Sequence, residues 1–381
     1  MAPSRPCNRA DSCASCAGEG RPGPPLSFAV AGLLVLAASA PAAAADGVFL
    51  RVESQTYSEP VSIDAALNRW DGAFHGGEIQ WSYNWAELGY RHRAWSLSAL
   101  YRRDFWLDFS ADAAELYYRT RHRLALQTGR RYAVDIAAYG FSARGLRAGW
   151  RHRFGADLTL AVGMSLFNAA DLMQGHLQGQ ATALADNDYS YDAYVDYTYD
   201  EDRLFGRQVE APDGLGASLD ARLAYRPTPR LTLRARAVDL LGLIRWKDAP
   251  YTRATATSDR RGFDEEGYII VEPAISGVEG YHSTYVQWLE PRLQLQAEQM
   301  LGERLSASLH YRYQFGQGLL GLGAGMAWGD GSLGLTAWPQ LAALGLRLRR
   351  HGVAFGLTLD SLGRRDIRTL WLGIGINTGT P

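Results

Sequence analysis

The chain is dominated by segments of about ten residues in which apolar and polar side chains alternate. The segment RLTLRARAVD, residues 230–239, places Arg230, Arg234 and Arg236 on one parity and leucine and alanine on the other. A helix would scatter these residues around its circumference, because helical side chains repeat every 3.6 positions, whereas a strand sorts them onto two faces. The pattern therefore predicts a β-strand with one apolar face and one charged face.

The same alternation recurs along most of the chain. It is found in residues 146–154, 158–167, 216–226, 291–299, 303–315, 345–350, 353–360 and 369–377. About ten residues is the length of a tilted strand that crosses a lipid bilayer.

The links between these segments are of two kinds. Very short links rich in glycine and proline lie near residues 155, 228, 302, 331 and 352, and they are typical of hairpin turns. Long polar links cover about residues 185–214 and 247–290. Short turns at one end and long loops at the other predict an all-β fold, a transmembrane antiparallel β-barrel of about 14 strands, within a range of 12 to 16.

The two faces of these strands need different surroundings. A charge that faces lipid at mid-membrane costs about 2 to 4 kcal/mol, so the arginines of residues 230–239 are expected to face the lumen. Aromatic residues near segment ends are interpreted as interfacial girdles, which favours a membrane barrel over a soluble all-β core. These aromatic residues are Trp81, Trp85, Tyr90, Trp95, Tyr101, Trp150, Tyr225, Trp246, Trp328, Trp338 and Trp371.

The N-terminus has the pattern of a secretory signal peptide. Arginines precede a short apolar run from Leu26 to Ala40, and small residues follow up to Ala45. We predict cleavage near Ala45, a signal peptide at 1–45, an N-terminal segment at 46–75 that is a plug or a first strand, and a barrel at 76–381. All three cysteines lie before the apolar run, so the exported chain has no thiol or disulfide.

Two stretches interrupt the regular pattern. In residues 78–92 the apolar parity changes near Glu87, which predicts a bulge or two adjacent strands. Residues 318–346 are nearly uncharged and rich in glycine, which makes them poor helix material and predicts a hairpin of lipid-facing strands.

With its export signal, alternating strands, aromatic residues and tight turns, the chain resembles the outer-membrane β-barrel proteins of Gram-negative bacteria. In size and strand number it is most similar to the long-chain fatty-acid transporter group of barrels. The resemblance implies a location in the cell outer membrane, contact with outer-membrane lipid and lipopolysaccharide, and insertion by the barrel-assembly machinery.

The candidate lumen-lining residues lie on the charged face of the predicted strands. They are Arg147, Arg151, Arg222, Arg234, Arg236, Glu298, Arg304, Arg312 and Arg347. They predict a cationic constriction for anions or head groups. The alternative is a ladder of arginines neutralised by Asp220, Glu298 and Asp360, because the net charge of the whole chain is only −1.

A second polar cluster lies in the segment 186–202, which alternates tyrosine with aspartate. Asp192, Asp196, Asp200 and Asp202 are weak candidate ligands for Ca²⁺, because calcium prefers carboxylate oxygens. The segment lacks the spacing of an EF-hand loop, so the alternative is a solvated extracellular strand and loop.

These features predict an outer-membrane channel or passive transporter for a small solute, anionic or lipophilic, that needs no cofactor. One alternative is a barrel that serves envelope assembly, anchoring or adhesion. The other is a lipid-modifying enzyme, for which His282 beside Ser283 is the local candidate, but no nucleophile motif accompanies it and we expect no enzyme activity. The near-zero net charge argues against nucleic acid as a partner.

Overall fold

The computed structural model describes residues 46–186, 188–258, 261–263, 269–271 and 274–378. These residues form a closed antiparallel barrel of 14 strand positions, which confirms the predicted fold class and strand number. The predicted signal peptide lies outside the described residues and stays a prediction. Within the described part, no helix has the length and hydropathy that a membrane span requires.

Strands make up most of the part of the chain that the structure describes. They are β1 (Gly47–Ser58), β2 (Ile79–His92), β3 (Trp95–Phe109), β4 (Arg131–Phe154), β5 (Leu158–Ala185), β6 (Asp188–Tyr199), β7 (Asp213–Thr228), β8 (Leu231–Thr257), β9 (Arg261–Phe263), β10 (Ile269–Val271), β11 (Ala274–Trp288), β12 (Arg292–Met300), β13 (Leu305–Gln314), β14 (Gln317–Trp328), β15 (Gly331–Trp338), β16 (Ala343–Arg350), β17 (Val353–Leu359) and β18 (Thr369–Asn377). The helices are α1 (Ile63–Leu67), α2 (Ala111–Arg121) and the short 3₁₀ helix η2 (Pro339–Leu341).

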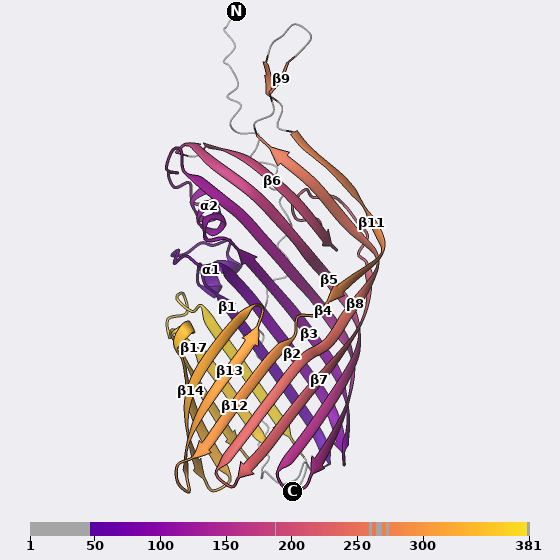
Figure 1. Ribbon diagram of the computed structural model, residues 1–381, viewed down its shortest axis with the longest axis vertical. Coiled ribbons are helices and arrows are strands. Elements are labelled where there is room, and N and C mark those ends of the chain that lie inside the picture. Colours follow the sequence, from indigo (N-terminus) through magenta and orange to yellow (C-terminus); the bar gives the residue numbers. More distant parts are fainter. Residues whose placement is uncertain (1–45, 187, 259–260, 264–268, 272–273, 379–381) are drawn as a thin grey trace, which may run out of the picture.

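Three long strands, β4, β5 and β8, belong to the barrel and continue above it. Along its lower half β5 pairs with β7, and along its upper half it pairs with β6. On one edge β8 pairs with the same two strands, and on the other edge it pairs with β12 and then with β11. The extensions of β4, β5 and β8, together with β6 and β11, form an upper sheet that rises above the barrel on one side (Figure 1).

Pairing of β1 with β18 closes the barrel, so both ends of the strand sequence lie in the wall. The short turns near residues 155, 229, 302, 330 and 352 all lie between consecutive antiparallel strands, as predicted. They lie at the same end of the barrel as the C-terminus, the lower end in Figure 1. By the usual asymmetry of such barrels this end faces the periplasm, and the upper sheet faces outward from the cell.

The two long links were predicted as loops, and that prediction was wrong for most of their residues. In residues 185–214 the main strand is β6, and 200–212 lie between strands, while β8 and β11 cover much of 247–290. The extension of β8 carries polar residues on both parities, such as Asp248 and Arg253, so its alternation is weak. In contrast, β6 alternates tyrosine with polar residues along most of its length.

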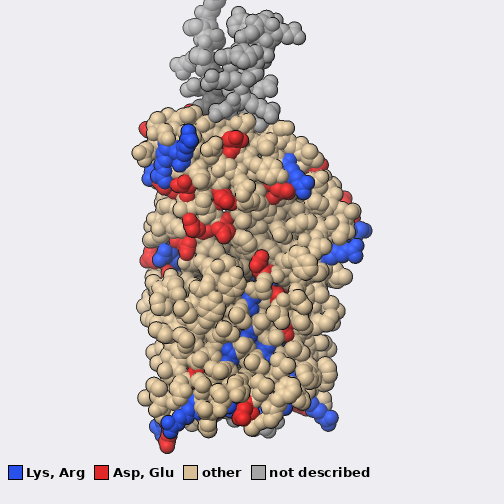
Figure 2. Space-filling view, in the orientation of Figure 1, with Lys and Arg blue, Asp and Glu red and all other residues tan. Residues whose placement is uncertain are grey.

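The outer face of the lower barrel is apolar. Exposed leucines and methionines cover it on many strands: Leu88, Leu97, Leu146, Met164, Leu166, Leu215, Leu295, Leu309, Leu322, Met326, Leu335 and Leu344. On the face seen in Figure 2, charged atoms gather in the upper half and at the lower rim, and the wall between them is largely uncharged apart from a short column in its middle. This apolar band is the surface that lipid covers in a membrane barrel.

The predicted irregularity near Glu87 does not exist. Strand β2 runs from residue 79 to residue 92 with an unbroken register to both neighbours. Trp81 and Glu87 both face inward and are buried, whereas Leu88 faces outward. The apparent phase change arises because the lumen itself changes from apolar to charged along β2, while the parity of the strand stays the same.

The glycine-rich stretch forms the predicted hairpin of lipid-facing strands, β14 and β15. Leu320, Leu322 and Leu335 project outward and are exposed, while glycines occupy the opposite parity.

The outward apolar band predicts a matched pair of substitutions. Leu322→Arg, in the middle of β14, should lower the free energy of unfolding by about 2 to 4 kcal/mol, because it places a charge in lipid. Leu204→Arg, similarly exposed in the segment 200–212, should change it by less than about 0.5 kcal/mol. Urea unfolding of the protein refolded into lipid vesicles, followed by tryptophan fluorescence, measures both. Equal effects would contradict the assigned membrane face.

Candidate functional site

The upper half of the lumen is filled by its own aromatic side chains. We call this cluster the aromatic layer; it comprises Tyr57, Ile79, Trp81, Tyr83, Trp85, Leu100, Val238, Phe315, Leu319, Trp338, Leu341, Ala343 and Trp371. The ring centroid of Trp81 lies 5.6 Å from Phe315 and 6.2 Å from Trp371, and Trp338 lies 5.2 Å from Trp371. These rings come from β1, β2 and β18 on one part of the wall and from the β13–β15 region on another, so they contact one another across the lumen.

This packing corrects the interpretation of the aromatic residues as girdles. Trp81, Trp85, Trp246, Trp338 and Trp371 are buried inside the barrel, with at most 4% of their surface exposed. Of the predicted girdle residues, Tyr90, Trp95, Tyr101 and Tyr225 are exposed large hydrophobics on the outside. Sequence alternation alone does not tell which parity faces lipid when both contain aromatic residues.

A buried group of four charges lies against this layer. Arg102 and Asp104 come from β3, Asp239 comes from β8 and Arg292 comes from β12; we call them the ion tetrad. Each arginine contacts both carboxylates: Arg102 reaches Asp104 and Asp239 at 2.6 Å, and Arg292 reaches them at 2.9 and 2.5 Å. All four side chains are at most 3% exposed. Reciprocal pairing of this kind is what a buried charge requires.

Aromatic rings cover the arginines of the tetrad. The Arg102 guanidinium lies 4.8 Å from the Phe141 ring, and that of Arg292 lies 4.1 Å from the Tyr83 ring. Cation–π contact with these rings compensates part of the lost hydration of the guanidinium groups. The tetrad and the aromatic layer therefore form one packed unit.

A bulge in β8 directs Asp239 into the lumen. Asp239 has a φ of 56°, and the register of β7 and β8 shifts between Leu219 and Ala221. The Asp239 backbone N–H donates to the Asp220 carboxylate at 3.2 Å, and the Ser218 hydroxyl donates to Asp239 at 2.6 Å. Aspartate tolerates the left-handed region better than most residues, and a bulge re-aims the side chain that it carries.

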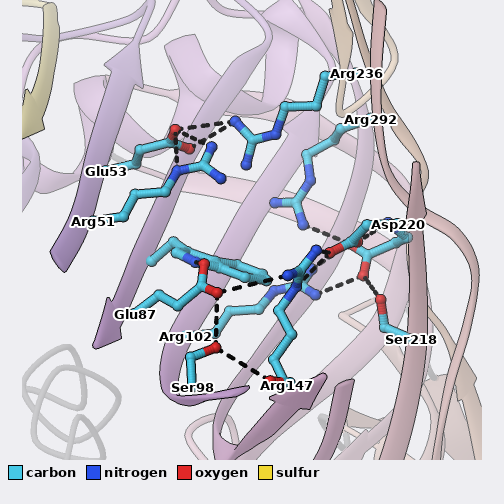
Figure 3. A network of polar contacts seen from close by, with 12 residues as sticks. Arg51, Glu53, Glu87, Ser98, Arg102, Arg147, Ser218, Asp220, Arg236 and Arg292 are labelled. Carbon is cyan, nitrogen blue, oxygen red and sulfur yellow. Dashed lines mark hydrogen bonds and ion pairs between the residues drawn. The ribbon is translucent and has the colours of Figure 1, made fainter. Parts of the chain in front are cut away.

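Further ion pairs continue from the tetrad toward the periplasm (Figure 3). Arg147 contacts Asp220 at 2.9 Å and Glu87 at 3.6 Å. Arg236 on β8 donates to both oxygens of Glu53 on β1 at 3.0 Å, although at least five strands separate β1 from β8 around the barrel. This pair therefore crosses the lumen.

Below these contacts lies a cavity of about 710 Å³, which we call the cationic chamber. Among the described residues that line it are eleven arginines and only four carboxylates. The carboxylates are Glu53, Glu87, Asp220 and Glu298. The predicted alternative of a neutral charge ladder does not describe this chamber. The net charge of the whole chain is −1, but the residues that line the chamber carry an excess of positive charge.

All nine sequence-predicted lumen residues line this one chamber. Four of the predicted residues take part in ion pairs: Arg147, Arg234, Arg236 and Glu298. The ion tetrad was not among the candidates. One signal for it was present in the sequence, because the alternation of β8 breaks at AVDLLG, where Asp239 begins the bulge.

Two of the four carboxylates proposed as weak calcium ligands, Asp196 and Asp202, have separate partners. Asp196 pairs with Arg253 at 2.9 Å, and Asp202 accepts from the backbone amides of Leu204 and Phe205. Burial raises the pKa of Asp202, but the hydrogen bonds, led by the one from the Phe205 amide, outweigh it and lower the pKa. Across the described ranges no three His, Cys, Asp or Glu residues are positioned to hold a metal ion.

Two histidines bear on the enzyme alternative. His282 lies between the rings of Tyr251 and Tyr285, at centroid distances of 4.4 and 5.4 Å. His310 in the lumen lies 2.9 Å from the Ser308 hydroxyl, but in the part of the chain that the structure describes no carboxylate is hydrogen-bonded to its ring. Neither arrangement supplies the oriented base of a hydrolase.

No family model matches the sequence, and no curated protein matches it. Among solved structures, a mutant of the monoaromatic hydrocarbon channel TodX is similar over 89% of this chain and 91% of its own, with 9% identity and a TM-score of 0.44. The toluene transporter TbuX of Ralstonia pickettii is similar over 87% and 90%, with 8% identity and a TM-score of 0.31. The β domain of the Bordetella autotransporter BrkA gives 11% identity over 88% and 100%, with a TM-score of 0.26.

All of these scores are below 0.5, so the function has to follow from the geometry of this chain alone. That geometry, a closed barrel with an apolar outer band and a charged interior, makes the chain an outer-membrane β-barrel protein. The predicted resemblance to this class is confirmed.

The ion tetrad predicts a second matched pair of substitutions. In Asp239→Asn, asparagine tolerates the left-handed backbone conformation as aspartate does. The substitution removes one of the two carboxylates that neutralise Arg102 and Arg292, so it should destabilise the barrel by about 3 to 5 kcal/mol. Asp171→Asn is the control, because Asp171 has the same φ of 56° but is exposed. It should change stability by less than about 0.5 kcal/mol. The midpoint of heat-dependent band shift in electrophoresis measures both, and similar midpoints would show that the tetrad is not structural.

Proposed function

We propose that the protein is a passive outer-membrane transporter for a small lipophilic solute, with a lumen that is closed to ions at rest. The observation that carries the proposal is the stacking of the aromatic layer directly over the cationic chamber within one lumen. Along β1 the lumen-facing residues read Arg51, Glu53, Gln55 and Tyr57, from the chamber to the layer. An apolar solute can dissolve among rings that exclude hydrated ions.

An open pore for hydrophilic solutes fits the contacts less well. The Glu53–Arg236 pair crosses the lumen, and Trp81 on β2 donates to Gln317 on the far wall at 3.2 Å. A hydrated solute would have to break buried ion pairs to pass. A lipophilic solute has only to displace aromatic side chains.

An anchoring barrel is the second candidate, and the sealed lumen favours it. The glycines of the chamber argue against it. Gly323, Gly325, Gly334, Gly373 and Gly375 all belong to the β13–β18 wall, and four of them line the lumen cavities: Gly325, Gly334, Gly373 and Gly375. Each glycine within a strand weakens that strand, by roughly 0.5 to 1 kcal/mol relative to alanine in the general case. A barrel that only anchors has no use for a cavity built at this cost in stability.

Electrical recording tests the sealed lumen. The refolded mature chain, residues 46–381, should give no steady openings in a planar bilayer, because the aromatic layer and the tetrad block hydrated ions. Steady openings with a preference for anions would instead mean an open pore whose filter is the arginine face.

Uptake of a small apolar solute tests transport itself. A Cβ added at Gly373 would meet no heavy atom within 4 Å, so Gly373→Phe should fold and fill the lumen. Cells that carry the wild-type barrel should take up radiolabelled naphthalene several times faster than cells with this variant. Gly302→Phe, in a periplasmic turn with equal open space, is the control and should keep the wild-type rate. A folded wild-type barrel without uptake would leave the anchoring barrel as the function.

A further inference from the structure

Most arginines of the cationic chamber have no carboxylate partner. Within the described residues, ion pairs are formed by Arg51, Arg147, Arg234 and Arg236. The other seven form none: Arg91, Arg151, Arg222, Arg304, Arg312, Arg347 and Arg349. In contrast to the tetrad, where every charge is matched, the chamber keeps a large positive excess beside open space.

Next to the unpaired arginines of β16 lie two glycines on neighbouring strands, Gly334 and Gly325, which we call the glycine floor. Arg347 lies opposite Gly334 of β15, and Gly334 lies opposite Gly325 of β14. Gly325 in turn lies opposite Ser306 of β13. A Cβ added at Gly334 would meet no atom closer than 3.8 Å, so the space beside this glycine is open, whereas a Cβ at Gly325 would meet the Ser306 hydroxyl at 2.5 Å.

The far side of this floor also carries polar groups. Ser306, Ser308 and His310 of β13 line the chamber, and beyond them Arg234 of β8 pairs with Glu298 at 2.7 Å. Arg347 interacts electrostatically with both Arg234 and Arg349, so guanidinium groups face the same space from two sides. Guanidinium and hydroxyl groups are the donors that bind carboxylate and phosphate oxygens.

We propose that the cationic chamber is a binding site for a small polyanion, one that carries two or more carboxylate or phosphate groups. One carboxylate would neutralise only one of the guanidinium groups that converge on the glycine floor, whereas a polyanion contacts several at once. The volume of about 710 Å³ lies within the range of ordinary ligand sites.

The ligand reaches the chamber from the periplasmic side. The aromatic layer closes the opposite side, whereas the chamber extends to Arg304 in the turn between β12 and β13. Binding is measured without transport. A negative binding result would therefore contradict this proposal and not the proposed transport function, and a negative uptake result would contradict only the transport function.

Isothermal titration calorimetry of the refolded mature barrel in detergent tests the site, at about 0.15 M salt so that diffuse attraction is screened. Citrate and inorganic pyrophosphate are the probes. We expect saturable binding of one molecule per barrel for at least one of them. Binding of citrate would indicate a preference for carboxylate groups, and binding of pyrophosphate a preference for phosphate groups. Arg347→Gln and Arg349→Gln should each weaken that binding tenfold or more.

Two further variants distinguish a specific binding site from non-specific attraction of anions to the positive charge. Gly334→Leu fills the floor without a change in charge, and it should abolish binding. Arg203→Gln removes an exposed arginine that pairs with Glu201 outside the chamber, and it should leave binding unchanged. Heat-dependent band shift verifies that each variant is folded. Absence of saturable binding to both probes, or binding that survives Gly334→Leu, would overturn the proposal.

Discussion

Every backbone N–H and C=O group within the bilayer has to find its partner inside the protein, because lipid offers none. Closure of the sheet by β1 and β18 satisfies this requirement around the whole wall. Once the wall is closed and its outside is apolar, polar and irregular features can lie only in the lumen or above the membrane. The bulge at Asp239, the ion tetrad and the upper sheet all occupy those places.

The wall could be predicted from the sequence because a strand between lipid and water leaves a period of two in its residues. Segments such as 303–315 carry that signal, and the strand number followed from counting them. The extension of β8 in the upper sheet left a weaker signal, since polar residues occur on both of its faces. The inward position of Trp81 and Trp371 was also missed, because a lumen packed with rings and a lipid face have the same apolar character in the sequence.

For the candidate site, the alternation identified the arginines of the chamber and two of their carboxylate partners, Asp220 and Glu298, but not the pairs that cross the lumen. Contacts such as Glu53 with Arg236 join strands on opposite sides of the barrel, and they depend on the diameter and the stagger of the strands. No local pattern encodes those quantities. The cationic character of the chamber was predicted from the arginines on one parity, but the near-zero net charge of the whole chain left a neutral ladder open as the alternative, because that sum hides a separation of charge between the lumen and the outer surface.

The continuity of β8 links two parts of the barrel that its neighbours keep apart. On both of its edges the partner strand is interrupted, between β6 and β7 and between β11 and β12, but β8 itself runs from the periplasmic turn to the top of the upper sheet. Asp239 lies on this strand at the level of the interruption between β11 and β12, below the one between β6 and β7. One continuous strand therefore connects the upper sheet directly to a carboxylate of the buried ion tetrad.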